Sequence, residues 1–178
     1  AKRGWKILPL HSQISDVCSC GISDCTSPGM HPRIEYWNER ATNKLNIIFD
    51  WWREWPEANI RVVTGLDSGI IVLNVDLKTN GVQSLNDIQK EFGLLPPTLT
   101  SKTERGGYQY FFKYPTNIRV IDNFPSGLKI IGDGGFVLVP PGYENSSGSF
   151  EWVGNPNEAP ISEIPDWLLG ALEVTPKV

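Results

Sequence analysis

The stretch Ile70-Ile71-Val72-Leu73-Asn74-Val75-Asp76 is apolar at every position except Asn74 and Asp76. Its β-branched residues favour a strand, and apolar side chains at both odd and even positions predict a strand buried on both faces. Alternate residues of a strand point to the same side, so Asn74 and Asp76 share one face at the end of this strand. The sequence therefore predicts an interior strand that presents two polar side chains where it ends.

Outward from this strand, apolar patterning and turn residues predict an α+β fold with mixed or antiparallel sheets flanked by helices. The expected strands cover Trp5–Leu10, Asn59–Thr64, Thr98–Thr103, Tyr108–Lys113, Leu128–Ile131, Phe136–Val139 and Phe150–Val153. The expected helices cover Asn46–Trp55, residues 83–92 and Pro165–Leu169. We expect one hairpin across residues 104–107 and a second around Gly132–Gly135. A length of 178 residues fits one domain, 1–178.

Composition is that of a soluble globular protein, with 40% hydrophobic and 20% charged residues. No apolar run approaches the roughly 20 residues of a membrane helix, and we expect neither a membrane segment nor a signal peptide. Because no Met begins the chain, we expect a fragment or a trimmed form of a protein. A net charge of −4 argues against a globally basic nucleic-acid binder but leaves room for a local basic face. The cations considered for that face, which as an alternative are simply solvated surface, are Lys78, Lys102, Arg105, Lys113, Arg119 and Lys129.

Three cysteines and a histidine are concentrated in one short segment, in the order Cys18, Cys20, Cys25 and His31. Three thiolates and one imidazole form a ligand set for tetrahedral zinc, and four protein ligands make such a zinc structural. We therefore predict a zinc-binding knuckle at about residues 16–34. Reactive or buried free cysteines are the alternative. His11, which precedes the knuckle, is expected to be a surface or packing residue.

Carboxylates at strand ends can hold the divalent ions that drive phosphoryl transfer, and the pattern D-x-D places two of them on one face. Here the first position is Asn74, which offers a neutral carbonyl oxygen in place of a charge. Asp76 alone makes a weak metal site. Its alternative role is to accept hydrogen bonds in the turn that follows, Lys78–Gly81.

The order of short motifs resembles the archaeo-eukaryotic primase superfamily, and most closely the N-terminal primase–polymerase (prim-pol) domain of bifunctional DNA primase/polymerases. The motifs that carry the resemblance are Gly4-Trp5, Pro9, the Cys/His segment, Asn59-Ile60, Thr64-Gly65, Val72–Asp76, Asn80-Gly81, Gly93–Thr98, Thr103 with Gly106-Gly107, Gly132–Phe136 and Pro140-Pro141. Such domains come from plasmids, phages and other mobile elements. The resemblance thus implies a cytoplasmic, prokaryotic setting.

The resemblance also exposes departures at the family's active-site positions. Its two strand-end acids fall on Asn74 and Asp76, its phosphate-contacting His falls on Gln109, and its third metal-binding acid falls on Lys129. The family's usual Arg two positions later is Ile131. Lys129 then puts a cation where a metal ion should sit.

From these departures we predict a catalytically degenerate prim-pol-like domain that binds DNA or nucleotide within a replication or mobile-element protein. Its cleft, between two sheet-bearing halves, would be lined by Lys78, Lys102, Arg105, Gln109 and Lys129, with Tyr108 or Tyr110 stacking a base. One alternative is an active DNA primase/polymerase, a DNA-directed nucleotidyltransferase that uses Mg²⁺ or Mn²⁺ held by Asp76 with Asp122 or Asp133. A second alternative is a protein-interaction module.

Overall fold

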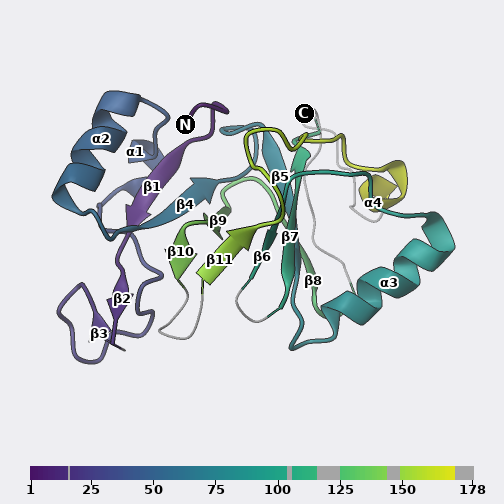
Figure 1. Ribbon diagram of the computed structural model, residues 1–178, viewed down its shortest axis with the longest axis horizontal. Helices are drawn as coiled ribbons and strands as arrows, with labels where there is room; N and C mark the ends of the chain where they lie inside the picture. The colour runs from purple at the N-terminus through teal and green to yellow at the C-terminus, as the bar shows by residue number, and fades with distance from the viewer. Residues whose placement is uncertain (16, 104–105, 116–124, 144–148, 171–178) are drawn as a thin grey trace.

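The structure, a computed structural model, describes residues 1–15, 17–103, 106–115, 125–143 and 149–170. Its strand ladders are antiparallel and form two main sheets with helices on their outer faces (Figure 1). The predicted α+β class with antiparallel sheets is therefore confirmed. Among the described helices, none is long and apolar enough to cross a membrane.

The smaller sheet has three strands in the order β1-β4-β9, with β1 at Ile7–Leu10, β4 at Asn59–Val63 and β9 at Phe136–Val139. Helix α2 (Leu45–Glu54) packs against its outer face through Trp51, and the short helix α1 (Trp37–Arg40) lies nearby. Trp51 is buried and Trp52 is partly buried against the core, so the tryptophans of α2 serve as packing residues. Strand β9 is an edge strand of this sheet, which matters for the pocket described below.

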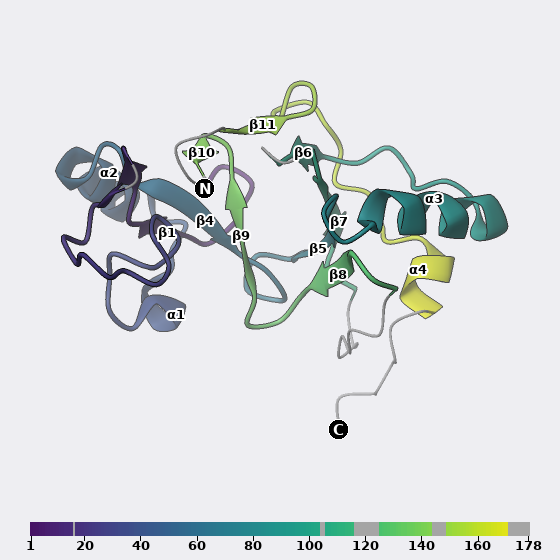
Figure 2. The ribbon, with the colours of Figure 1, turned by 90° about the horizontal axis from the view of Figure 1, so that it is seen from below.

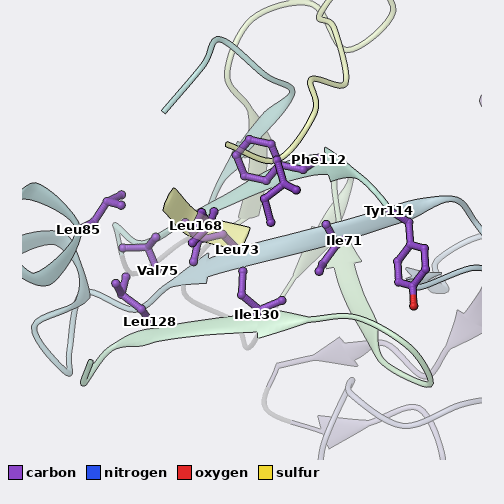
Figure 3. Close-up of a cluster of buried hydrophobic side chains, with 10 residues drawn as sticks. Ile71, Leu73, Val75, Leu85, Phe112, Tyr114, Leu128, Ile130 and Leu168 are labelled. Atoms are coloured by element: carbon purple, nitrogen blue, oxygen red, sulfur yellow. The ribbon is translucent and has the colours of Figure 1, made fainter. Parts of the chain in front are cut away.

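The larger sheet has the order β10-β11-β6-β7-β5-β8. Its strands are β5 (Ile70–Val75), β6 (Thr100–Lys102), β7 (Tyr108–Lys113), β8 (Leu128–Ile131), β10 (Gly142–Tyr143) and β11 (Ser149–Trp152). As predicted, β5 is an interior strand, and its apolar residues are buried on both faces. Ile71, Leu73 and Val75 point to the outer face, where α3 (Gly81–Phe92) supplies Leu85 and α4 (Asp166–Gly170) supplies Leu168 (Figure 3).

The opposite face of β5 packs toward the smaller sheet. Ile70 and Val72 join Val62 of β4, Val137 of β9 and Phe111 of β7 in a second buried cluster. Figure 2 shows the two sheets side by side, with α2 on one flank and α3 and α4 on the other. This apolar cluster fills one part of the space between the sheets. Polar side chains line the other part.

The chain passes from one sheet to the other at Gly132–Gly135, where a hairpin was expected. That prediction is wrong, because β8 pairs with β5 whereas β9 pairs with β4. The glycine-rich segment does turn, but the sequence pattern does not specify which strand each arm will meet. The other expected hairpin is confirmed as the antiparallel pair β6–β7. Helix α1, strand β10 and the hairpin of β2 (Gln13–Ile14) with β3 (Val17–Cys18) were not predicted.

Candidate functional site

A row of polar residues crosses the larger sheet at the end of β5. Asn74 lies directly opposite Gln109 of β7 on one side and Lys129 of β8 on the other. Directly opposed residues of antiparallel strands share a face, so these three side chains lie on the face turned toward the smaller sheet. Gln109 is buried, and its Oε1 accepts a hydrogen bond of 2.9 Å from Ser101 Oγ, whereas Lys129 is exposed. The structure thus brings together three residues that lie far apart in the sequence.

Asp76 follows β5 by one residue and is fixed by close backbone contacts. Its N–H donates to Gly127 O over 2.8 Å, and its carbonyl accepts from Gly81 N over 2.8 Å. A Cβ at Gly81 would come within 2.2 Å of Gly127 O, so only glycine permits this approach. Asp76 Oδ1 also accepts a 2.8 Å hydrogen bond from the N–H of Lys78, which is the turn role expected as its alternative.

A pocket of about 240 Å³ lies between the two sheets at this polar end. The larger sheet contributes Asn74, Asp76 and Gln109 to its lining. The smaller sheet contributes residues from both faces of edge strand β9, so the pocket wraps around that edge. Met30 reaches the lining from the Cys/His segment. Of the residues expected to line a cleft between two sheet-bearing halves, Gln109 is the one found in this lining among the described residues.

Arg61 of β4 also lines the pocket, and sequence reasoning missed it. It is only 8% exposed, and its Nε has no hydrogen-bond partner within the described part of the chain. Its guanidinium carbon lies 3.8 Å from the centre of the Phe136 ring. Burial lowers the pKa of Arg61 from its ordinary value to about 10, which still leaves the side chain protonated at neutral pH. The sequence clue was a single cation inside the apolar strand Asn59–Val63.

None of the predicted cations in the described part of the chain lines the pocket. Lys102 pairs in register with Tyr108, one residue out of step with Ser101 and Gln109, so it belongs to the opposite face of the sheet. Tyr108 and Tyr110 pack with the outer, helix-covered cluster and do not face the pocket. Lys78 is exposed in the turn after Asp76. Arg105 and Arg119 lie outside the described residues.

Of the two further acids considered as metal ligands, Asp133 is held away from Asp76. Asp133 Oδ1 accepts a 3.0 Å hydrogen bond from Leu66 N, and its Oδ2 accepts one from the Tyr114 hydroxyl. Both contacts lie at the start of β5, where Gly65 bridges to Ile70. A strand of six residues is roughly 17–20 Å long, which is too far for Asp133 and Asp76 to share an ion. Asp122 lies outside the described residues.

Cys18, Cys20, Cys25 and His31 converge as their spacing predicts. One potential ligand atom from each lies within 4.8 Å of the others, and no other such group of His, Cys, Asp or Glu is found within the described ranges. Burial raises the pKa of Cys18, but hydrogen bonds from the N–H groups of Gly29 and Cys20 and from His31 outweigh it and lower the pKa to about 6. A thiol that ionises readily is a good metal ligand. These four side chains can hold a metal ion.

His11 supports this group from outside. Its ring packs on that of His31 with centroids 4.3 Å apart, and its Nδ1 lies 2.9 Å from Ser19 Oγ. Arg33 donates to the same hydroxyl over 2.7 Å. The expectation of a packing role for His11 is confirmed, and the residue it packs against is a candidate ligand.

The family model for the N-terminal domain of bifunctional DNA primase/polymerases (Prim-Pol) matches residues 1–167. The matched region includes both sheets, the Cys/His segment and every residue placed at the pocket. No curated protein matches the chain.

Proposed function

The chain belongs to the family of bifunctional DNA primase/polymerase N-terminal domains, and from this premise we propose that it is a prim-pol domain that has lost nucleotidyl transfer and retains binding of DNA or nucleotide. Membership implies a role in DNA replication and contact with DNA and nucleotides in general. The degenerate site is the finer proposal. We extend the proposal to the fold, as one archaeo-eukaryotic primase-type domain over residues 1–178.

The observation that carries the proposal is the register of Lys129, Asn74 and Gln109 across three neighbouring strands. These are the positions that the family resemblance assigns to an acid, an acid and a histidine. Two divalent ions need several negative ligands, and here an amide and an ammonium group stand beside the single carboxylate of Asp76. Loss of each charge-stabilising group typically lowers a rate about 10²–10³-fold, and losses within one site do not simply add.

We also propose that the Cys/His group holds zinc. Sulfur and imidazole ligands favour zinc over Mg²⁺ or Mn²⁺, and four protein ligands leave no open position for chemistry. Zinc there would be structural, and it would hold the segment that carries Met30 against the pocket.

Primer extension and primer synthesis, each with Mg²⁺ and with Mn²⁺, test the loss of catalysis. We expect the natural chain to be inert and to bind DNA with an affinity that falls as salt rises, as phosphate contacts require. The triple revertant Asn74→Asp, Gln109→His, Lys129→Asp should extend primers. Lys44→Asp, which repeats the charge change of Lys129→Asp at the exposed start of α2, is the control and should stay inert.

Primer extension by the natural chain would overturn the proposal and favour the active-enzyme alternative. Inert behaviour without any salt-dependent DNA binding would instead favour the protein-interaction module. Activity in the revertant would support the residue correspondence on which the degenerate-site proposal depends.

A further inference from the structure

Arg61 is buried, charged and without a hydrogen-bond partner for Nε in the described structure, and it lines a pocket. A buried cation without a partner destabilises a fold, because the group has lost its water. Contact with the Phe136 ring offsets part of that cost, since aromatic faces attract cations. No ion pair of Arg61 occurs among the described residues. The missing partner is therefore best sought among ligands that enter the pocket.

The neighbouring groups indicate what kind of ligand that is. Gln109 is 5% exposed, and Ser101 occupies its carbonyl oxygen, so the group it has left to offer the pocket is its NH₂. Asn74 lines the same pocket and offers a second amide. A planar guanidinium and two amides lining one pocket match the oxygens of a phosphate group, which Arg binds through two parallel hydrogen bonds.

We propose that this pocket is a phosphate-binding site that works without a divalent ion, with Arg61 as its central cation and Gln109 and Asn74 as additional hydrogen-bond donors. The inference rests on the proposed function, because it names the part of a nucleotide or DNA strand that the degenerate site recognises. Arg61 comes from the smaller sheet, whereas the substituted active-site positions lie on the larger one. The positive charge is thus supplied from across the pocket.

Asp76 is the one carboxylate in the described lining, and it opposes an anion. One of its oxygens is engaged by the N–H of Lys78. Lys129, on the same face beside Asn74, places a second cation next to the polar row. The negative charge of Asp76 lowers the affinity for phosphate. The positive charge of Lys129 offsets part of this repulsion.

The size of the pocket sets how the ligand enters. About 240 Å³ is smaller than the roughly 300–1,000 Å³ of pockets that enclose a whole small molecule. The pocket can hold phosphate groups, while a sugar and base remain outside. Two sources share this chemistry, a nucleoside triphosphate and the phosphorylated end of a strand.

Calorimetric titration tests the proposal, in buffer without added divalent ions. The probes are dATP against deoxyadenosine, and a 5′-phosphorylated oligonucleotide against the same strand with a 5′-hydroxyl. We expect at least one phosphorylated probe to bind more tightly than its partner without the terminal phosphate. Preference in the first pair identifies the nucleotide as the source, and preference in the second identifies the strand end.

Three variants locate the effect. Arg61→Met should weaken binding of the preferred probe roughly 10- to 100-fold, the usual consequence of losing hydrogen bonds to a charged group. Arg61→Lys keeps the positive charge but lacks the planar guanidinium. Its affinity for the probe should lie between those of the natural chain and Arg61→Met. Arg53→Met, at an exposed arginine of α2, is the matched control and should bind like the natural chain.

The unfolding temperature shows whether Arg61→Met is folded. Without ligand, this variant should unfold at the same temperature as the natural chain or at a higher one. Replacing an unpaired buried charge by an apolar side chain of similar length is often neutral or stabilising. A folded Arg61→Met variant with undiminished binding, or binding that requires added Mg²⁺, would overturn the inference. Those results leave salt-dependent DNA binding by surface cations intact, whereas the proposed function fails only by primer extension or by the absence of DNA binding.

Discussion

The Cys/His group and the strand-end group of Asn74, Asp76, Gln109 and Lys129 are both brought together by the fold, but they offer a cation very different surroundings. In the Cys/His group, three sulfurs and one ring nitrogen lie within 4.8 Å of one another. In the strand-end group, antiparallel register aligns an amide, a second amide and a lysine beside one carboxylate. The first set has the ligand chemistry of a metal site, and the second offers one carboxylate among neutral and cationic side chains.

In the strand-end group, the backbone arrangement and the charge of the side chains depend on different residues. Strand pairing depends on the backbone and on the buried faces of β5, β7 and β8, which remain apolar where they pack under α3 and α4. Substitutions at the polar end of the strands alter the charge of the site without touching that core. The strand geometry therefore does not depend on whether these positions carry metal ligands.

The largest effect should come from the Cys/His group, through Cys18→Ser or removal of the metal by a chelator. Zinc contributes about 10–16 kcal/mol of apparent binding free energy in zinc-finger peptides, and that energy drives their folding. The segment around the group has little apolar burial to replace it, since Ile14, Val17 and Ile22 are each more than half exposed. We expect amide hydrogen exchange at residues 17–34 to become fast, while β5 and β7 remain protected.

His11→Ala is the control for that experiment, because it removes the ring that packs on His31 and keeps all four ligands. It should retain one zinc per chain and weaken its affinity by no more than the 10–100-fold typical of supporting residues. Unchanged exchange in zinc-depleted Cys18→Ser would mean that hydrogen bonds such as Asn59 Nδ2 to Gly29 O hold the segment on their own.

The sequence was sufficient to predict the residues of both groups, for different reasons. Cys18, Cys20, Cys25 and His31 lie close together along the chain, so their convergence follows from spacing. Asn74 and Gln109 lie far apart in the sequence, and the family resemblance, which assigns both to one site, implied that they would meet. In each case a local pattern carried the necessary information.

Arg61 could not be predicted in the same way, because its environment is created by tertiary packing. An arginine between Ile60 and Val62 in a strand is ordinarily a solvent-facing residue by alternation. Here the larger sheet and edge strand β9 enclose that position, and only the assembled fold shows this. The wrong hairpin at Gly132–Gly135 has the same origin, since strand partners depend on contacts made at long range.

A smaller effect should follow from restoring charge to the strand-end group with the double variant Asn74→Asp, Lys129→Asp. Two new carboxylates beside Asp76 should repel one another without metal and bind Mn²⁺ when it is present. Saturation at about 100 times the dissociation constant adds about 2.7 kcal/mol of stability. For a chain of this size, this raises the unfolding temperature by roughly 5–10 °C. Differential scanning calorimetry with and without Mn²⁺ measures the shift.

The natural chain and Lys44→Asp provide the comparison, and both should show no Mn²⁺-dependent shift from the strand-end group. A shift of equal size in the natural chain would mean that Asp76 already holds the ion. The contrast between the two groups would then be one of affinity and not of ligand chemistry.

The smallest effect should come from Tyr114→Phe, which tests whether Asp133 takes part in the strand-end group. Loss of the hydroxyl that donates to Asp133 should cost about 1 kcal/mol and lower the unfolding temperature by roughly 2–4 °C. Because Asp133 is held at the opposite end of β5 from Asp76, adding Tyr114→Phe to the double variant should leave its Mn²⁺ shift unchanged. Changes in unfolding free energy are additive when two sites are distant and share no partner. Calorimetry of the combined variant therefore tests directly whether Asp133 and the strand-end group are independent. A reduced Mn²⁺ shift would couple the two ends of the strand and bring Asp133 back as a metal ligand.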